Sequence, residues 1–271
     1  MYWYNGVLDP GETLQISIHN PGLLYGATVF TTLRVYDGTL DHSLTFWQAH
    51  CDRLRHSIQT LGWTSPDWKQ IHQGAIALAQ QYPILRITLF PEGQEWITGR
   101  SLPPDLSEQQ QHGITAWVAT PPEDYGRSLP HLKTGNYLAS WQAKRDAQAY
   151  HAQEAILINA AGHWLETSTG TLWGWGKGTW WTPPLADGIL PGIGRSHLMS
   201  RLRCQNERIR ETSWTGDVIS QLEAIAYSNA VVGVVPIHTV LINAERQRFN
   251  PKHPSIQTLV TQFHSTSSPD F

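Results

Sequence analysis

An amine, a carboxylate and a glycine-bounded turn follow one another along the second half of this sequence. They are Lys133, Glu166 and the turn Gly192-Ile193-Gly194. A lysine amine can form a Schiff base with an aldehyde once its pKa is lowered. A carboxylate can keep a proton on a neighbouring ring nitrogen, and the backbone N–H groups that open a helix attract phosphate. Together the three groups are of the kinds that could bind an aldehyde, a ring nitrogen and a phosphate.

The order and spacing of these groups resemble the class-IV (fold-type IV) pyridoxal-phosphate family. This family contains branched-chain and D-amino-acid aminotransferases and aminodeoxychorismate lyases. The resemblance runs from about Tyr25 to Pro236, through the segments Leu132–Leu138, Glu166–Leu172 and Leu190–Arg195. It implies pyridoxal 5'-phosphate as the cofactor. Thr171 departs from the pattern, because an asparagine is common at that position in the family.

The resemblance also implies a role for each residue of the first group. Lys133 carries the cofactor as a Schiff base and then moves the proton at the substrate carbon. Glu166 contacts the pyridine nitrogen, and the backbone amides of Ile193 and Gly194 bind the phosphate. Arg53, in a segment like the family's His-x-x-Arg-Leu, is the counter-charge to that phosphate.

Three further residues have a functional and an ordinary interpretation. Ser228 and Asn229 resemble the junction at which family members bind phosphate, but a polar pair before a strand is also a common turn. Thr32, in Phe30-Thr31-Thr32, resembles the lyase residue that relays a proton near the lysine, and it also suits an ordinary strand. The substrate carboxylate site stays open, with Arg86, His50 and Arg100 as candidates.

The elements that position these residues alternate between strands and helices. The N-terminus predicts a hairpin, and an apolar stripe from Leu44 to Leu61 predicts a helix that ends near Gly62. Strands Ile84–Phe90 and Ile114–Ala119 are expected in one sheet. The other expected elements are strand Val29–Val35, helix Trp68–Gln81, helix Leu138–Ala152, strand Glu154–Asn159, helix Ser196–Asn206, short helix Gln221–Ala226 and strand Val231–Val235. The polar tail Ser265–Phe271 predicts a mobile end.

The predicted fold class is α+β with two domains. We expect an N-terminal domain over residues 1–119, a linker rich in proline over 120–126, and a C-terminal cofactor-binding domain over 127–271. The family resemblance implies a smaller N-terminal α/β sandwich, a larger β-barrel-like C-terminal domain, as in D-amino-acid aminotransferase, and a homodimer.

Composition excludes several classes of partner. With 40% hydrophobic and 15% charged residues and a formal net charge of -3, nothing suggests nucleic acid or an anionic membrane surface. No apolar run approaches the roughly 20 residues needed to cross a bilayer. The N-terminus lacks the pattern of a secretory signal, and Cys51 and Cys204 have no metal-ligand spacing. We expect a cytoplasmic protein that binds a small amino substrate.

The reaction itself has two interpretations. A lyase acting on 4-amino-4-deoxychorismate would release pyruvate and 4-aminobenzoate for folate biosynthesis, whereas an aminotransferase would exchange nitrogen between branched-chain or D-amino acids and 2-oxoglutarate. We favour the lyase, from the compact length, the Phe30-Thr31-Thr32 segment and Ser228-Asn229-Ala230. The segment Tyr25–Phe30 looks more like the branched-chain aminotransferases. A relative that kept the fold and lost catalysis is a third possibility, although Lys133, Glu166 and Arg53 are all present.

Overall fold

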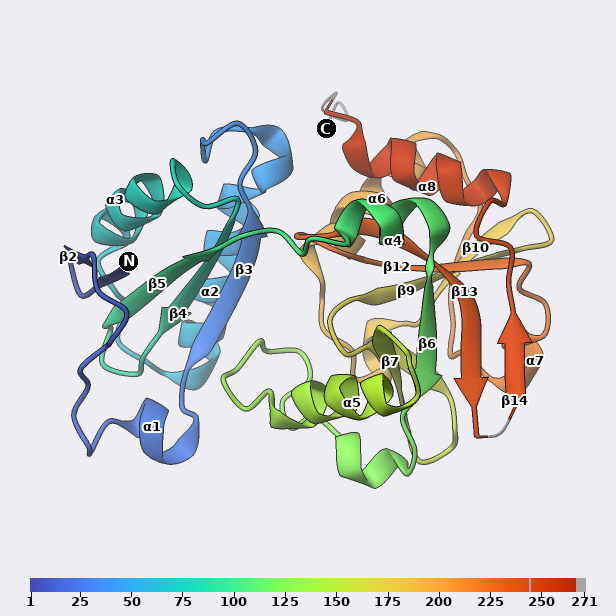
Figure 1. The fold of residues 1–271 in the computed structure, drawn as a ribbon, viewed down its shortest axis with the longest axis horizontal. Coiled ribbons are helices and arrows are strands. Elements are labelled where there is room, and N and C mark those ends of the chain that lie inside the picture. Colours follow the sequence, from blue (N-terminus) through green and yellow to red (C-terminus); the bar gives the residue numbers. More distant parts are fainter. Residues whose placement is uncertain (244, 267–271) are drawn as a thin grey trace. The chain divides into compact units, whose positions relative to one another are not determined.

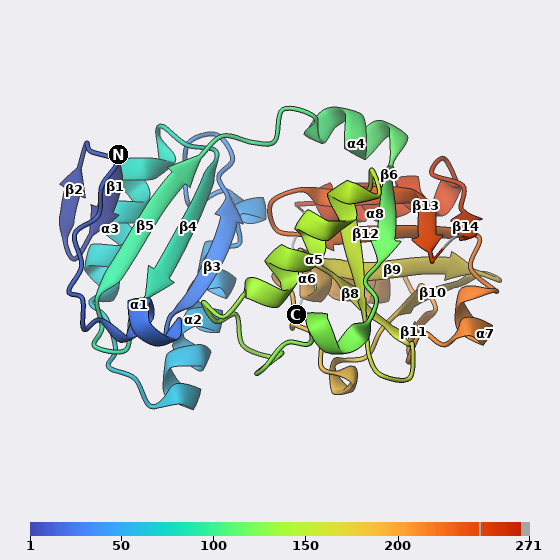
Figure 2. The same cartoon turned by 60° about the horizontal axis from the view of Figure 1, so that its bottom comes forward.

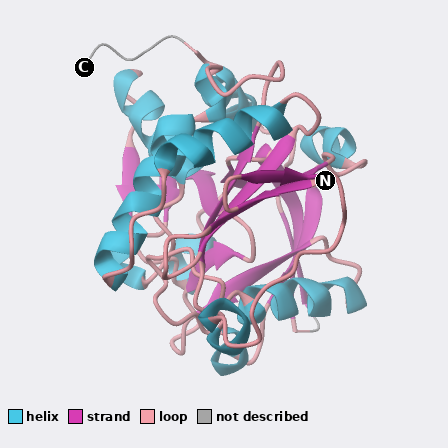
Figure 3. Ribbon diagram, turned by 90° about the vertical axis from the view of Figure 1, so that its left-hand side faces the viewer, coloured by secondary structure: helices cyan, strands magenta, loops and turns pink. Residues whose placement is uncertain are grey.

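A computed structural model of the chain describes residues 1–243 and 245–266 (Figure 1). Most of the predicted mobile tail, residues 267–271, lies outside the described residues. The chain forms two compact units, Met1–Pro103 with Leu132–Asn136, and Pro104–His131 with Tyr137–Phe271. The segment 120–126, predicted as a linker, lies in the second unit. Helices and strands are mixed in the α+β manner, as Figure 3 shows by colour.

The first unit is an antiparallel sheet covered by helices on one face. The strand order is β2-β1-β5-β4-β3, and α2 and α3 lie against the same face of the sheet (Figure 2). Leu33, Ile87, Leu54 and Ile71 are among the side chains of the core between these layers. The elements are β1 (Tyr2–Tyr4), β2 (Val7–Asp9), α1 (Pro21–Tyr25), β3 (Val29–Arg34), a 3-10 turn (Ser43–Thr45), α2 (Trp47–Leu61), α3 (Trp68–Ala79), β4 (Ile84–Leu89) and β5 (Glu95–Arg100).

Local sequence signals set the ends of the two covering helices. α2 ends where predicted, at Gly62, whose φ of 67° is readily adopted only by glycine among common residues. α3 begins after Asp67, whose carboxylate accepts hydrogen bonds from the backbone N–H groups of Lys69 and Gln70. The N-terminal hairpin and strand β3 are also confirmed.

The second unit is built on a larger curled sheet of mixed pairing. The strand order is β11-β10-β9-β12-β13-β6-β7-β8, with β14 paired to β13. Its elements are α4 (Leu106–His112), β6 (Ile114–Val118), a 3-10 turn (Pro122–Tyr125), α5 (Leu138–Ala149), β7 (Glu154–Ile158), β8 (Trp164–Thr167), β9 (Thr171–Gly176), β10 (Thr179–Thr182), a 3-10 turn (Leu185–Asp187), α6 (Ile193–Cys204), β11 (Ile209–Glu211), α7 (Gly216–Ile219), β12 (Ala224–Asn229), β13 (Gly233–Ile242), β14 (Glu245–Arg248) and α8 (Pro254–His264).

Two predictions about these elements are wrong. Ile84–Leu89 and Ile114–Val118 lie in different sheets, because β6 pairs in parallel with β13 and β7 instead of continuing the first sheet. The predicted short helix over Gln221–Ala226 is replaced by strand β12, which starts at Ala224 between β9 and β13. Both faces of β12 are buried, so it has no alternating pattern, and a short apolar run without alternation does not distinguish a buried strand from a helix.

Within residues 1–243 and 245–266, every helix is too short or too polar to cross a bilayer.

We expect the substitution Gly74→Ala to destabilise the first unit. A Cβ built on Gly74, inside α3, would lie 2.4 Å from Cγ of Trp3, whose indole donates to Glu95 at 3.0 Å and is held in place. Alanine normally stabilises a helix interior by about 1 kcal/mol relative to glycine. Here we expect the overlap to lower the free energy of unfolding by about 1–3 kcal/mol, measured by urea denaturation.

The matched control is Gly216→Ala at the start of α7, where a Cβ would meet no atom of the described residues within 4 Å. An unfolding free energy for Gly74→Ala equal to or above that of the parent would show that Trp3 is free to move.

Candidate active site

Lys133 lies in a short extended segment that pairs with the start of β3. Phe30 donates its backbone N–H to the carbonyl of Lys133 at 2.8 Å, and Thr134 forms an antiparallel bridge with Val29. The Lys133 Nζ lies 4.8 Å from the centroid of the Phe30 ring. The sheet therefore fixes the backbone of the lysine, and an aromatic face contacts its amine.

Thr32 lies two residues after Phe30 on β3. Successive side chains of a strand point to opposite faces, so Thr32 shares a face with Phe30 and the amine of Lys133. Arg86 pairs with Thr32 across the sheet, and its guanidinium lies 3.6 Å from the Phe30 centroid. This face therefore carries two cationic side chains over one ring, with the hydroxyl of Thr32 on the same side. Its role as a proton relay stays a prediction.

Thr31 points to the other face of β3 and joins His50 and Arg53 of α2. Arg53 donates from Nη2 to the Thr31 hydroxyl at 2.5 Å, and that hydroxyl lies 2.5 Å from His50 Nδ1. Burial, together with the charges of Arg53 and Lys133, holds the pKa of His50 well below its ordinary value. A neutral His50 accepts the Thr31 hydrogen at Nδ1, so Thr31 connects the imidazole to the guanidinium.

Glu166 lies at the end of β8 as a buried carboxylate, with its side chain 8% exposed. Its Oε1 forms an ion pair with Nη1 of Arg127, and its Oε2 accepts the backbone N–H of Leu190 at 3.2 Å. Arg127 is equally buried, at 7%, and also donates to the carbonyl of Pro130 at 2.9 Å. Sequence reasoning missed Arg127. The need of a buried carboxylate for a cation predicts such a partner without saying which arginine supplies it.

The glycine turn opens α6, which starts at Ile193 rather than at the predicted Ser196. A Cβ on Gly192 would lie 3.1 Å from Oγ1 of Thr171, and one on Gly194 would lie 3.3 Å from the backbone carbon of Asn229. Gly192 also has no side chain to cap the first N–H groups of the helix. The structure therefore brings together the amides of Ile193 and Gly194 and the junction at Asn229.

Ser228 and Asn229 point in different directions at the end of β12. The Ser228 hydroxyl is buried and accepts the indole N–H of Trp173 at 2.9 Å. Asn229 accepts the backbone N–H groups of Val231 and Val232 at 2.8 and 2.9 Å through Oδ1. Asn229 thus organises the turn beside Gly194, while Ser228 is engaged with Trp173. Phosphate binding by either residue stays a prediction.

These groups meet the chemical demands of pyridoxal 5'-phosphate. The first unit supplies an amine on a fixed backbone and an arginine held by Thr31. The second unit supplies a buried carboxylate and a helix N-terminus preceded by Gly192, which has no side chain to cap it. Leu190 connects the last two, because its N–H is bound by Glu166 and it lies two residues before Gly192. Each unit by itself therefore carries groups of the kinds that such a cofactor needs: an amine and an arginine in the first, and a carboxylate and a helix N-terminus in the second.

We expect His50 to make the stability of the protein depend on pH. Because its folded pKa is lowered, the unfolded chain binds the proton first as the pH falls below the ordinary value of 6.5. The stability that the neutral imidazole contributes is therefore full above that pH and decreases below it, by at most about 1.4 kcal/mol per pH unit. Urea denaturation from pH 8 to pH 5 measures this slope.

The variant His50→Asn keeps an acceptor near the Nδ1 position and does not titrate, so its slope should be shallower than that of the parent. His56→Asn, on the exposed side of the same helix, is the control. An unchanged slope in His50→Asn would contradict a neutral buried imidazole.

Comparison with known proteins places the chain among relatives of two activities. Residues 28–240 match the family model described as amino-transferase class IV. An aminodeoxychorismate lyase from Vibrio harveyi is 22% identical over 252 residues, which cover 88% of this chain and 90% of that protein. A branched-chain-amino-acid aminotransferase from Salmonella typhimurium is 21% identical over 263 residues, covering 88% and 84%.

The fold also has close counterparts among solved structures. The crystal structure of branched-chain aminotransferase from Thermoproteus uzoniensis superposes with a TM-score of 0.79 at 21% identity, over 97% of this chain and 92% of that chain. A likeness at this identity establishes the fold, and the predicted two-domain fold-type IV architecture is confirmed.

Proposed function

Because the chain belongs to the amino-transferase class IV family, we propose that it is a pyridoxal 5'-phosphate enzyme that acts as an aminodeoxychorismate lyase. The observation that carries the cofactor proposal lies in the second unit, where the carboxylate of Glu166 is buried and binds the backbone N–H of Leu190 just before a glycine-opened helix. The first unit supports it with a sheet-anchored Lys133, whose Nζ lies against Phe30. The bound cofactor would supply an electron sink for the electron pair left when the substrate carbon loses its proton.

The residues of this chain would then act as follows. Lys133 binds the cofactor through its amine and afterwards accepts the proton from the substrate carbon, which passes on to the departing enolpyruvyl group. Glu166 holds a proton on the ring nitrogen, and Arg127 keeps that carboxylate oriented. Arg53 and the amides of Ile193 and Gly194 bind the phosphate. In the lyase reaction the carbon–oxygen bond to the enolpyruvyl group breaks, pyruvate leaves and the ring becomes aromatic.

Thr32 supports the lyase over the aminotransferase. Its hydroxyl shares a face of β3 with Phe30, whose ring contacts the amine of Lys133, whereas the hydroxyl of Thr31 is bound by Arg53. Thr32 is therefore the threonine of this pair on the side where a proton relay to the lysine is needed. The aminotransferase is the second candidate, favoured by the resemblance of Tyr25–Phe30 to branched-chain enzymes.

Two further properties belong to this proposal. The family resemblance supports a homodimer. Cys51 and Cys204 are free thiols, which supports a cytoplasmic location.

We expect the purified enzyme, loaded with the cofactor, to convert 4-amino-4-deoxychorismate into 4-aminobenzoate and pyruvate. The fluorescence of 4-aminobenzoate follows the first product, and a coupled lactate dehydrogenase assay follows the second in equal amount. No product, together with ready transfer of nitrogen from leucine or alanine to 2-oxoglutarate, would reject the lyase in favour of the aminotransferase.

We expect Lys133→Ala to abolish turnover and covalent attachment of the cofactor while the fold is kept. Borohydride reduction followed by mass spectrometry should place the cofactor on Lys133 in the parent and leave the variant unlabelled. Lys69→Ala, at an exposed position on α3, is the control and should label like the parent. Labelling of the Lys133 variant on another lysine, or turnover close to that of the parent, would refute the assignment.

A further inference from the structure

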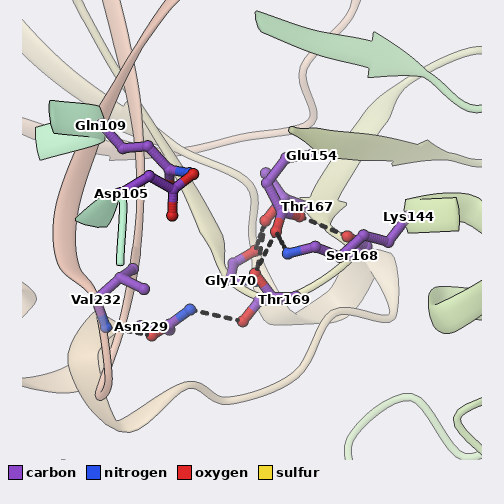
Figure 4. A network of polar contacts seen from close by, with 10 residues as sticks. All are labelled: Asp105, Gln109, Lys144, Glu154, Thr167, Ser168, Thr169, Gly170, Asn229 and Val232. Atoms are coloured by element: carbon purple, nitrogen blue, oxygen red, sulfur yellow. Dashed lines mark hydrogen bonds and ion pairs between the residues drawn. The ribbon is translucent and has the colours of Figure 1, made fainter. Parts of the chain in front are cut away.

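Glu154 is a buried acid that the proposed reaction does not use. It lies at the start of β7 with 1% of its surface exposed. Its Oε2 accepts the hydroxyl of Ser168 at 2.5 Å, and its Oε1 accepts the hydroxyl of Thr169 at 2.8 Å and the ammonium of Lys144 at 2.6 Å (Figure 4). A buried carboxylate is costly unless it is paired and hydrogen-bonded. The three donors therefore fix the position of the Glu154 carboxylate, and the carboxylate in turn fixes the position of the donor groups.

Ser168 and Thr169 form the turn that joins β8 to β9. The turn begins two residues after Glu166 and leads into Thr171, whose Oγ1 lies close to Gly192. Its backbone is also tied to β7, because the N–H of Ser168 donates to the carbonyl of Ala155 at 2.8 Å. The carboxylate of Glu154 thus fixes the side chains of a turn that has a proposed cofactor ligand at one end.

The turn also contacts the proposed phosphate site. The amide nitrogen of Asn229 donates to the carbonyl of Thr169 at 3.2 Å, and its oxygen accepts the backbone N–H of Val232 (Figure 4). The same oxygen also accepts the backbone N–H of Val231. A Cβ on Gly194 would lie 3.3 Å from the backbone of Asn229. Polar contacts therefore run from Lys144 through Glu154 and Thr169 to Asn229, whose backbone packs beside Gly194 in the first turn of α6.

We propose that Glu154 is a positioning residue for the phosphate of the cofactor. Its carboxylate orients the Ser168–Thr169 turn, and that turn holds Asn229 against the helix N-terminus that binds the phosphate. Glu154 contacts neither the reacting carbon nor Glu166 in this arrangement, so it acts on cofactor affinity and leaves the chemical step to Lys133. This inference rests on the proposed use of pyridoxal 5'-phosphate.

The test compares two vitamers that differ only in the phosphate. The dissociation constants of pyridoxal 5'-phosphate and of pyridoxal are measured by absorbance titration for the parent and for Glu154→Gln, which keeps the shape and removes the charge. We expect the phosphorylated form to bind the variant about tenfold more weakly, as expected for the loss of a charged hydrogen-bond acceptor. The affinity for pyridoxal should stay within about twofold, and so should kcat at saturating cofactor.

A second variant and a control complete the design. Thr169→Val removes one hydroxyl donor to Glu154 and keeps the carbonyl that binds Asn229, and it should weaken phosphate-dependent affinity in the same direction. Glu223→Gln removes a half-exposed acid of the same unit that pairs with His253, and its affinities should equal those of the parent.

Each outcome decides a separate question. If the parent binds neither vitamer, the proposed function fails. If the parent binds and Glu154→Gln loses equal affinity for both vitamers, or none, Glu154 is only a fold residue and the inference is overturned. A kcat that falls tenfold or more at saturating cofactor would assign Glu154 to the chemical step and would overturn it as well. A loss of affinity for pyridoxal 5'-phosphate that is not seen for pyridoxal supports the inference. The thermal midpoint of unfolding is measured alongside.

Discussion

The burial of the Glu166 carboxylate is the constraint on which the second unit depends. Removing an ionised group from water costs several kcal/mol, and only a well-placed partner offsets that cost. Arg127 supplies the partner charge, and Leu190 supplies a backbone hydrogen bond. Because these contacts tie two stretches of the chain, at Arg127 and at Leu190, to one side chain, they also position the turn that begins at Gly192. The position of the proposed ring-nitrogen ligand and that of the proposed phosphate site are therefore consequences of the same ion pair.

The first unit also buries a titratable side chain, that of His50, but there the buried group is neutral. His50 is enclosed on α2 beside two cations, and burial holds its pKa low, so it is an acceptor for Thr31 rather than a third positive charge. Thr31 in turn accepts from Arg53. The Thr31 hydroxyl is hydrogen-bonded on both sides, which restricts the motion of the Arg53 side chain. Rigidity is what an arginine needs if it is to contribute to affinity instead of losing side-chain entropy when phosphate binds.

The sequence singled out residues with distinctive chemistry and not their partners. Lys133 and Glu166 were chosen because a lysine, a glutamate and a glycine turn occur in a fixed order, and their roles stay predictions. Arg127 could not, because an arginine in a polar loop is ordinary until the fold places it on a carboxylate. Likewise helix α2 could be predicted from its apolar stripe and Gly62. Strand β12 could not be predicted, since burial on both faces removes the alternation of apolar and polar residues that identifies a strand. The sheet membership of β6 depended on parallel pairings with distant β13, which local patterns do not contain.

The choice between lyase and aminotransferase depends on where one proton goes, and the fold shared by both kinds of relative leaves that open. The two adjacent threonines of β3 have the same chemistry, so composition and spacing do not separate them. The alternation of side chains between the two faces of the strand does separate them. Thr31 turns toward α2, where Arg53 and His50 engage its hydroxyl, and Thr32 turns toward the ring that contacts the amine of Lys133. A second proton carrier on the lysine side is useful to an enzyme that must both deprotonate a carbon and protonate a departing oxygen. A transferase can return the same proton with its lysine alone, and this difference is the physical basis for preferring the lyase.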